Sequence, residues 1–185
     1  MRLVIKCFAI SIGLLCPFLG SADTYSFGTL PANGKISGTP GSTIGWGYTL
    51  ANDSATDWLV VTNLNTDTFL YGVPEFVFDF PILGPAGFVS VDFDPVLGAG
   101  LLGLTFDSTA PVNFIDSGSF DLSAEWWSGD PTSGGSYIAD APDALRAYSA
   151  QVTVQTPECT SAGLLLGGIT LIATMGILRK CRAIF

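Results

Sequence analysis

The side chains of this sequence best suited to chemistry are aromatic and acidic, and they gather in its second half. Trp126 and Trp127 are adjacent, and Asp130 and Tyr137 follow them. Successive residues of a strand point to opposite faces, so one of the two tryptophans is expected to face water. An exposed Trp127 beside Asp130 and Tyr137 could stack on a sugar ring, which makes these three residues the expected ligand platform. The preferred alternative is that both tryptophans pack, one in the core and one beneath the following loop.

Carboxylates supply the other possible chemistry. Asp92 and Asp94 stand two residues apart in one expected strand, and Asp107, Asp116 and Asp121 follow. Loops that carry several carboxylates can coordinate Ca²⁺ through six to eight oxygen ligands. The sequence contains no EF-hand loop or repeated calcium motif, so a solvated acidic face is the preferred interpretation. We therefore predict no metal site.

The residue types that usually perform catalysis are scarce. The sequence has no histidine, and none of its four cysteines lies within residues 24–158. The commonest general base and the thiolate metal ligands are therefore missing from the middle of the chain. No pair of carboxylates is recognisable as a glycosidase pair. We expect no enzyme and no cofactor.

Acidic charge dominates the same region. All 16 acidic residues fall within residues 23–158, where Lys35 and Arg146 are the only basic residues, so this region carries a net charge of −14. Such a surface repels the phosphate backbone of nucleic acids and anionic lipid headgroups. We therefore expect no nucleic-acid partner.

Short strands are the elements that would carry these residues. Residues 43–50 alternate so that four large apolar side chains share one face: Ile44, Trp46, Tyr48 and Leu50. Similar runs recur, separated by Gly, Pro, Asn and Asp, and no stretch of ten residues shows a helical period. About eight such runs predict an all-β domain over residues 23–155, a single antiparallel β-sandwich in the Ig-like style. An open barrel is the alternative.

Aromatic packing would hold this sandwich together, because no disulfide can form within it. Trp46, Trp58 and Trp126 are the expected core positions.

Two segments interrupt the pattern of strands, and each gives a prediction of its own. Asn52-Asp53-Ser54 fits a glycosylation sequon, but a plain turn is the preferred interpretation. Residues 128–144 read as a long Gly/Ser/Asp/Pro-rich loop, and loops of that length are often functional.

The N-terminal sequence MRLVIKCFAISIGLLCPFLGSAD predicts a secretory signal peptide over residues 1–22. Two basic residues, Arg2 and Lys6, precede an apolar run that is short for a membrane span. Small residues then lead to the expected signal peptidase site between Ala22 and Asp23. The alternative is an uncleaved N-terminal anchor.

The C-terminal sequence predicts a transmembrane helix. Residues 160–178 contain no charge, and a helix of that length covers about 28 Å, close to the thickness of the hydrocarbon core of a bilayer. The basic residues that follow are expected to stay in the cytosol. Both basic ends of the chain would then face inward, and the acidic middle would be exported.

The residues around this helix carry a specific resemblance. Pro157 and Glu158 stand directly before the apolar run, and three basic residues follow it: Arg179, Lys180 and Arg182. This order is similar to the PEP-CTERM sorting signal of Gram-negative bacteria. The resemblance covers residues 156–185 and does not extend to the domain before them.

The resemblance implies recognition by an exosortase, a membrane-embedded cysteine transpeptidase-like enzyme, and processing near the Pro-Glu pair. Cys159 stands where that family usually has a proline. The family also implies an inner-membrane-anchored precursor and then a place at the cell surface or in an extracellular polysaccharide matrix. The expected function is thus that of a non-catalytic exported surface or matrix protein. Two alternatives stay open: an ordinary C-terminal anchor, and a carbohydrate-binding module displayed at the surface.

Overall fold

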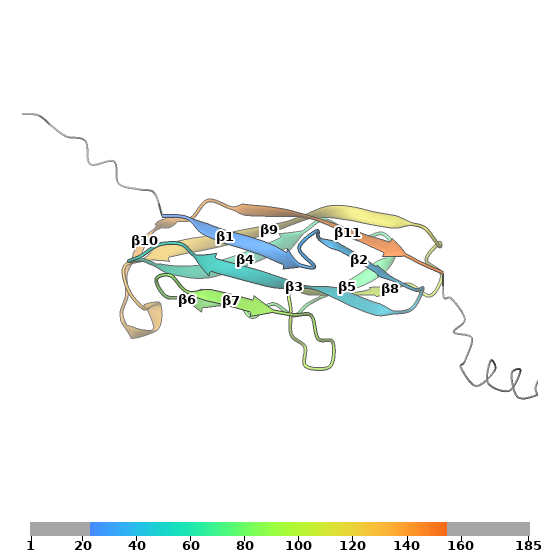
Figure 1. Cartoon of the computed structure of the whole chain (residues 1–185), viewed down its shortest axis with the longest axis horizontal. Coiled ribbons are helices and arrows are strands. Elements are labelled where there is room, and N and C mark those ends of the chain that lie inside the picture. The colour runs from blue at the N-terminus through green and yellow to red at the C-terminus, as the bar shows by residue number, and fades with distance from the viewer. Residues whose placement is uncertain (1–22, 155–185) are drawn as a thin grey trace, which may run out of the picture.

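The computed structural model describes residues 23–154, and these form two β-sheets that pack face to face (Figure 1). The predicted signal peptide and sorting signal lie outside the described residues. The elements in chain order are β1 (Tyr25–Leu30), β2 (Lys35–Gly38), β3 (Thr43–Asn52), β4 (Trp58–Thr66), β5 (Gly72–Phe76), β6 (Ile82–Leu83), β7 (Phe88–Val91), β8 (Leu102–Phe106), β9 (Ile115–Trp127), the 3₁₀ turn η1 (Pro131–Ser133), β10 (Tyr137–Asp140) and β11 (Ala144–Val152). Among residues 23–154, no helix is long and apolar enough to cross a membrane.

Each sheet is organised by one long strand. In the first sheet β3 pairs with β1 on one side, while β8 and then β7 follow its other side, and β5 completes the edge beyond β8. In the second sheet β9 pairs with β4 on one side and with β11 and β10 on the other. The all-β prediction is confirmed, and the arrangement is sandwich-like.

One strand departs from the predicted antiparallel pattern. β2 runs parallel to β11, with Lys35 opposite Ser149 and Gly38 opposite Val152. The chain leaves β1 in the first sheet, turns at residues 31–34 and enters the second sheet as β2. After this crossover, β2 pairs with the free edge of β11 and runs in the same direction as β11. The second sheet is therefore mixed, and the prediction of a purely antiparallel sandwich is wrong at this edge.

The core forms where the inner faces of the two sheets meet. The predicted alternation of β3 is confirmed, because Trp46, Tyr48 and Leu50 are buried. Ile44, near the start of the strand, is partly buried. The ring of Trp46 lies 5.2 Å from Phe120 and 5.3 Å from Tyr148, centroid to centroid. Aromatic contacts of this kind add about 1 kcal/mol each beyond the burial of apolar area.

Three predictions from the sequence need correction. Trp58 is not a core residue: it is partly exposed, because β4 begins with it on the face that points away from the other sheet. Residues 128–144 are not one long loop, since they contain η1 and β10. The prediction that Asp92 and Asp94 share a strand face also fails, because β7 ends at Val91. The carboxylate of Asp94 accepts the backbone N–H groups of Val96 and Leu97 and closes a turn.

The turn after β3 is built around a buried amide. Asn52 is 2 % exposed, and its Nδ2 group donates to the carbonyl oxygens of Asp57, Leu83 and Gly84 at 2.8, 3.2 and 2.9 Å. Its Oδ1 accepts the backbone N–H of Ser54. With both ends of the amide enclosed and bonded, Asn52 cannot take a glycan, so the interpretation as a plain turn is confirmed.

We predict that Asn52→Ala lowers the free energy of unfolding by about 3 kcal/mol, because it leaves buried carbonyl oxygens without donors. Urea unfolding of the purified protein measures this loss. Asp53→Ala is the matched control, since Asp53 is exposed in the same turn, and its effect should stay within about 0.5 kcal/mol. Equal losses in the two variants would contradict the role given to the amide.

Candidate ligand-binding surface

Strand β9 divides its two tryptophans between the faces of the sheet. Trp126 is 5 % exposed and packs in the core, with its ring 6.2 Å from that of Tyr25 in an edge-to-face contact. Trp127, the next residue, lies on the outer face and is partly exposed. Strand alternation places Trp126 in the core and Trp127 on the outer face, where its ring meets Tyr137 of residues 128–144 edge to face. The preferred expectation that both tryptophans pack is met fully by Trp126 and in part by Trp127.

Trp127 belongs to a row of aromatic residues that crosses three strands. The strand register sets Trp58 of β4 directly opposite Trp127 of β9, and Tyr137 of β10 directly opposite Trp127 on its other side. We call Trp58, Trp127 and Tyr137 the aromatic row. Gly84 lies against Trp58, and a Cβ there would sit 3.6 Å from the indole, in ordinary van der Waals contact with it.

Hydrogen bonds hold two of these rings in place. The Nε1–H group of Trp127 donates to Oε2 of Glu125 at 3.1 Å, and the hydroxyl of Tyr137 donates to Oδ1 of Asp140 at 3.0 Å. The bond to Asp140 raises the pKa of Tyr137 and keeps its hydroxyl protonated. The two ring centroids lie 6.3 Å apart with their planes at 85°. A ring fixed in this way loses little conformational entropy when a ligand binds.

The third residue of the expected ligand platform, Asp130, plays a different part. Its carboxylate accepts the backbone N–H and the hydroxyl of Thr132 at 2.8 and 2.7 Å, and it caps η1. Hydrogen bonds from the Thr132 side chain, then from its backbone, lower the pKa of Asp130. The structure therefore brings together Trp127 and Tyr137 but leaves Asp130 engaged in shaping the loop between their strands.

Three members of the surface were missed by the sequence analysis. Glu125 stands two residues before Trp127, so strand alternation alone could have placed it on the same face. Asp140 bonds to Tyr137 three residues earlier, a pairing that the expected loop over residues 128–144 does not predict. Trp58 lies far away in the sequence, and its position beside Trp127 depends on the β4–β9 register, which no local pattern reveals.

Two further carboxylates, Asp116 and Asp67, make structural contacts. Asp116 is buried and accepts the backbone N–H of Leu70 at 2.7 Å. Asp67 accepts the backbone N–H of Ser119 at 2.8 Å and joins the end of β4 to β9. Within the described part of the chain, no three side chains of His, Cys, Asp or Glu converge as metal ligands.

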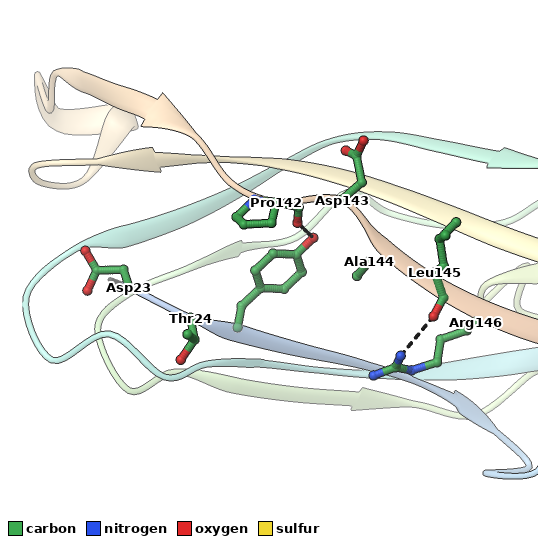
Figure 2. Close-up of a pocket in the computed structure, with 8 residues that line it drawn as sticks. Asp23, Thr24, Pro142, Asp143, Ala144, Leu145 and Arg146 are labelled. Carbon is green, nitrogen blue, oxygen red and sulfur yellow. Dashed lines mark hydrogen bonds between the residues drawn. The ribbon is translucent and has the colours of Figure 1, made fainter. Parts of the chain in front are cut away.

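A separate cleft of about 330 Å³ opens where the start of β1 meets the start of β11 (Figure 2). Residues 23–25 and 142–146 line it. Asp23 and Arg146 lie at opposite ends of this lining in Figure 2, and the guanidinium of Arg146 donates to the carbonyl oxygen of Leu145. The cleft thus combines apolar walls with charges of both signs and could hold a small polar molecule.

Tyr25 joins the two walls of this cleft. Its hydroxyl donates to the carbonyl oxygen of Pro142 at 2.8 Å, with Leu122 as a second acceptor at 3.3 Å. Burial raises the pKa of Tyr25 to about 12, and the charges of Asp143 and Asp121 add to the rise. The protonated hydroxyl is therefore the form that holds β1 against β9 and the segment before β11.

Comparisons with known proteins found no similar protein: no family model matches this chain, and no curated protein matches it either. The candidate surface therefore has to be chosen from the geometry of the structure. Of the two surfaces, the aromatic row has the more defined arrangement, because hydrogen bonds fix two of its rings. The aromatic row sets flat apolar ring faces beside carboxylate acceptors, an arrangement suited to binding a ligand.

We predict that Tyr25→Phe makes the protein less sensitive to alkali. An unfolded tyrosine ionises near pH 10, whereas folded Tyr25 ionises at about 12. Because the folded-state pKa is raised, the contribution of Tyr25 to stability is complete below pH 10 and is lost as the pH rises through about 12. Thermal unfolding midpoints of wild type and variant should converge over that range. Parallel curves for the two proteins would contradict the role of the hydroxyl.

Proposed function

We propose that this protein is a non-catalytic exported protein, displayed at the cell surface or in an extracellular polysaccharide matrix after sorting by an exosortase. The two ends of the sequence support the proposal. Residues 1–22 read as a signal peptide, and residues 156–185 resemble a PEP-CTERM signal. An Ig-like strand arrangement, a transmembrane helix over residues 160–178 in the precursor and a basic cytosolic tail belong to the same proposal.

The position of the aromatic row supports display. Gln151, near the end of β11, lies opposite Ile115 at the start of β9, whereas Trp127 ends β9. The 13 residues of β9 span about 40 Å at ~3.3 Å per residue. The described chain therefore leaves the domain at one end of its long axis, while β10 and the end of β9 lie at the other (Figure 1). A tether that follows residue 154 would hold the aromatic row away from its point of attachment.

We predict that Glu158→Ala blocks processing without affecting the fold. The reason is that an exosortase would read the Pro-Glu pair, whereas Glu158 follows, in the sequence, the last described strand, which ends at Val152. In a host with a working exosortase, fractionation and immunoblotting should find the variant unprocessed in the inner membrane. Glu75→Ala, an exposed carboxylate of β5, is the control and should be sorted like wild type. Equal surface yields of Glu158→Ala and wild type would favour an ordinary anchor.

A second function, carbohydrate binding, is favoured by the fixed orientation of Trp127. Its indole is partly exposed and held by Glu125, the condition that stacking on a sugar ring needs. Trp127 packs only in part, so a portion of its indole stays accessible to a sugar on the outer face. Carbohydrate binding would take place on the displayed domain and is compatible with a role in the matrix.

We predict that Trp127→Ala reduces the retention of the protein on polysaccharide at least tenfold, because it removes the ring on which a sugar would stack; the loss corresponds to about 1.4 kcal/mol or more. Affinity electrophoresis in gels that contain bacterial exopolysaccharide measures the retention. Phe88→Ala is the matched control, since Phe88 is an exposed aromatic residue of β7 in the other sheet. If Trp127→Ala and Phe88→Ala are both retained as strongly as wild type, the aromatic row is excluded as the binding surface.

A further inference from the structure

We propose that Trp127 and Tyr137, with Glu125 and Asp140, bind the protonated amino groups of a polysaccharide that carries free amino sugars. The inference deepens the carbohydrate-binding candidate and rests on it. It names the class of polymer, and it follows from how the two rings and the two carboxylates lie relative to one another.

The two rings form a corner rather than a plane. Their planes meet at 85°, with 6.3 Å between the centroids of Trp127 and Tyr137. An uncharged, ribbon-like glycan stacks best on rings that share one plane, and this pair does not offer such a plane. The faces of aromatic rings carry negative charge density, so they attract a cation that lies over them. A corner lets one ammonium group approach both aromatic side chains.

The carboxylates add charge to the same corner. The β9–β10 register sets Asp140 directly opposite Glu125, and each of them accepts a hydrogen bond from one of the two rings. Like charges that face each other across a strand pair repel, and a bound cation would relieve that repulsion. The only basic residues of the described part, Lys35 and Arg146, lie on β2 and β11, so neither β9 nor β10 supplies that cation itself.

Access to the corner is open. Half of the surface of Tyr137 is exposed, and Asp140 is exposed on the same strand. Glu125 uses Oε2 for Trp127, and a carboxylate has further acceptor sites for ammonium or hydroxyl donors. The acidic surface of the domain also favours a cationic ligand over a uronate or sulfate polymer.

Trp58 indicates a sugar rather than an isolated amine. It lies one strand away from Trp127 in the aromatic row, about 4.8 Å along the sheet. A pyranose ring could rest on Trp58 while the amino group of its neighbour enters the corner. An amino-sugar polymer supplies both features, whereas a lysine side chain supplies only the cation.

Isothermal titration of the full chain, purified in detergent, tests the proposal with four probes. These are a β-1,4-linked glucosamine oligomer, the same oligomer N-acetylated, a β-1,4-linked glucose oligomer and oligolysine. We expect the glucosamine oligomer to bind at least roughly tenfold more tightly than the other three, and its affinity to fall as salt screens the charges. N-acetylated or glucose oligomers that bind equally well would overturn the amine preference and leave a neutral carbohydrate module. Stronger binding of oligolysine would indicate a protein partner, and absence of binding by all probes would exclude the site.

Variants that remove charge without removing hydrogen bonds complete the test. Glu125→Gln and Asp140→Asn keep an acceptor for Trp127 and Tyr137, and each should weaken binding of the glucosamine oligomer roughly fivefold. Asp107→Asn removes one exposed charge from the loop after β8 and should bind like wild type. If all three variants weaken binding of the glucosamine oligomer equally, the effect comes from the net charge of the domain, and the proposed site is wrong. Sorting does not enter this measurement, so failure of surface display and failure of amine binding are distinguishable.

Discussion

The contact of Trp46 with Phe120 and Tyr148 is the interaction on which both sheets depend. Trp46 comes from β3 of one sheet, and its two partners come from β9 and β11 of the other. Its Nε1–H also donates to the carbonyl oxygen of Gly34 at 2.9 Å, in the turn where the chain crosses between sheets. No cysteine lies within residues 24–158, so side-chain packing, rather than a disulfide, has to hold this domain closed.

That packing also positions the outer surface. Phe120, Leu122 and Trp126 point inward from β9 and are almost fully buried, which sets the rotation of the whole strand. Glu125 and Trp127 must then point outward, because successive side chains alternate. The candidate binding residues thus stand on a strand held by the core, and only the β10 side of the surface belongs to a hairpin. A site on such an element keeps its geometry better than one on a loop.

Much of the inner face could be predicted from the sequence, whereas the outer surface could not. The alternation in β3 and at the end of β9 is local, so the burial of Trp46, Tyr48 and Trp126 follows from it. Pairing between distant segments places Trp58 beside Trp127 and sets β2 parallel to β11. Local sequence patterns do not reveal which residues of distant strands lie opposite each other. Asp130 was assigned to the ligand platform because of its neighbours, but a short turn uses its carboxylate. The signals at the two ends of the chain lie outside the described residues and stay predictions.

The antiparallel pairing of β9 with β11 also decides how the domain would bear mechanical load. If the chain is held beyond Val152 and a polymer pulls on Trp127, the force runs along both strands. The register of this pair joins eight residue pairs, from Ala144 opposite Leu122 to Gln151 opposite Ile115. Force in that direction shears these hydrogen bonds together, whereas a tether at the near end of β11 would peel them apart one at a time. Under the proposed display, attachment beyond Val152 would therefore make the sandwich a mechanically stiff link between the anchoring surface and a bound polymer.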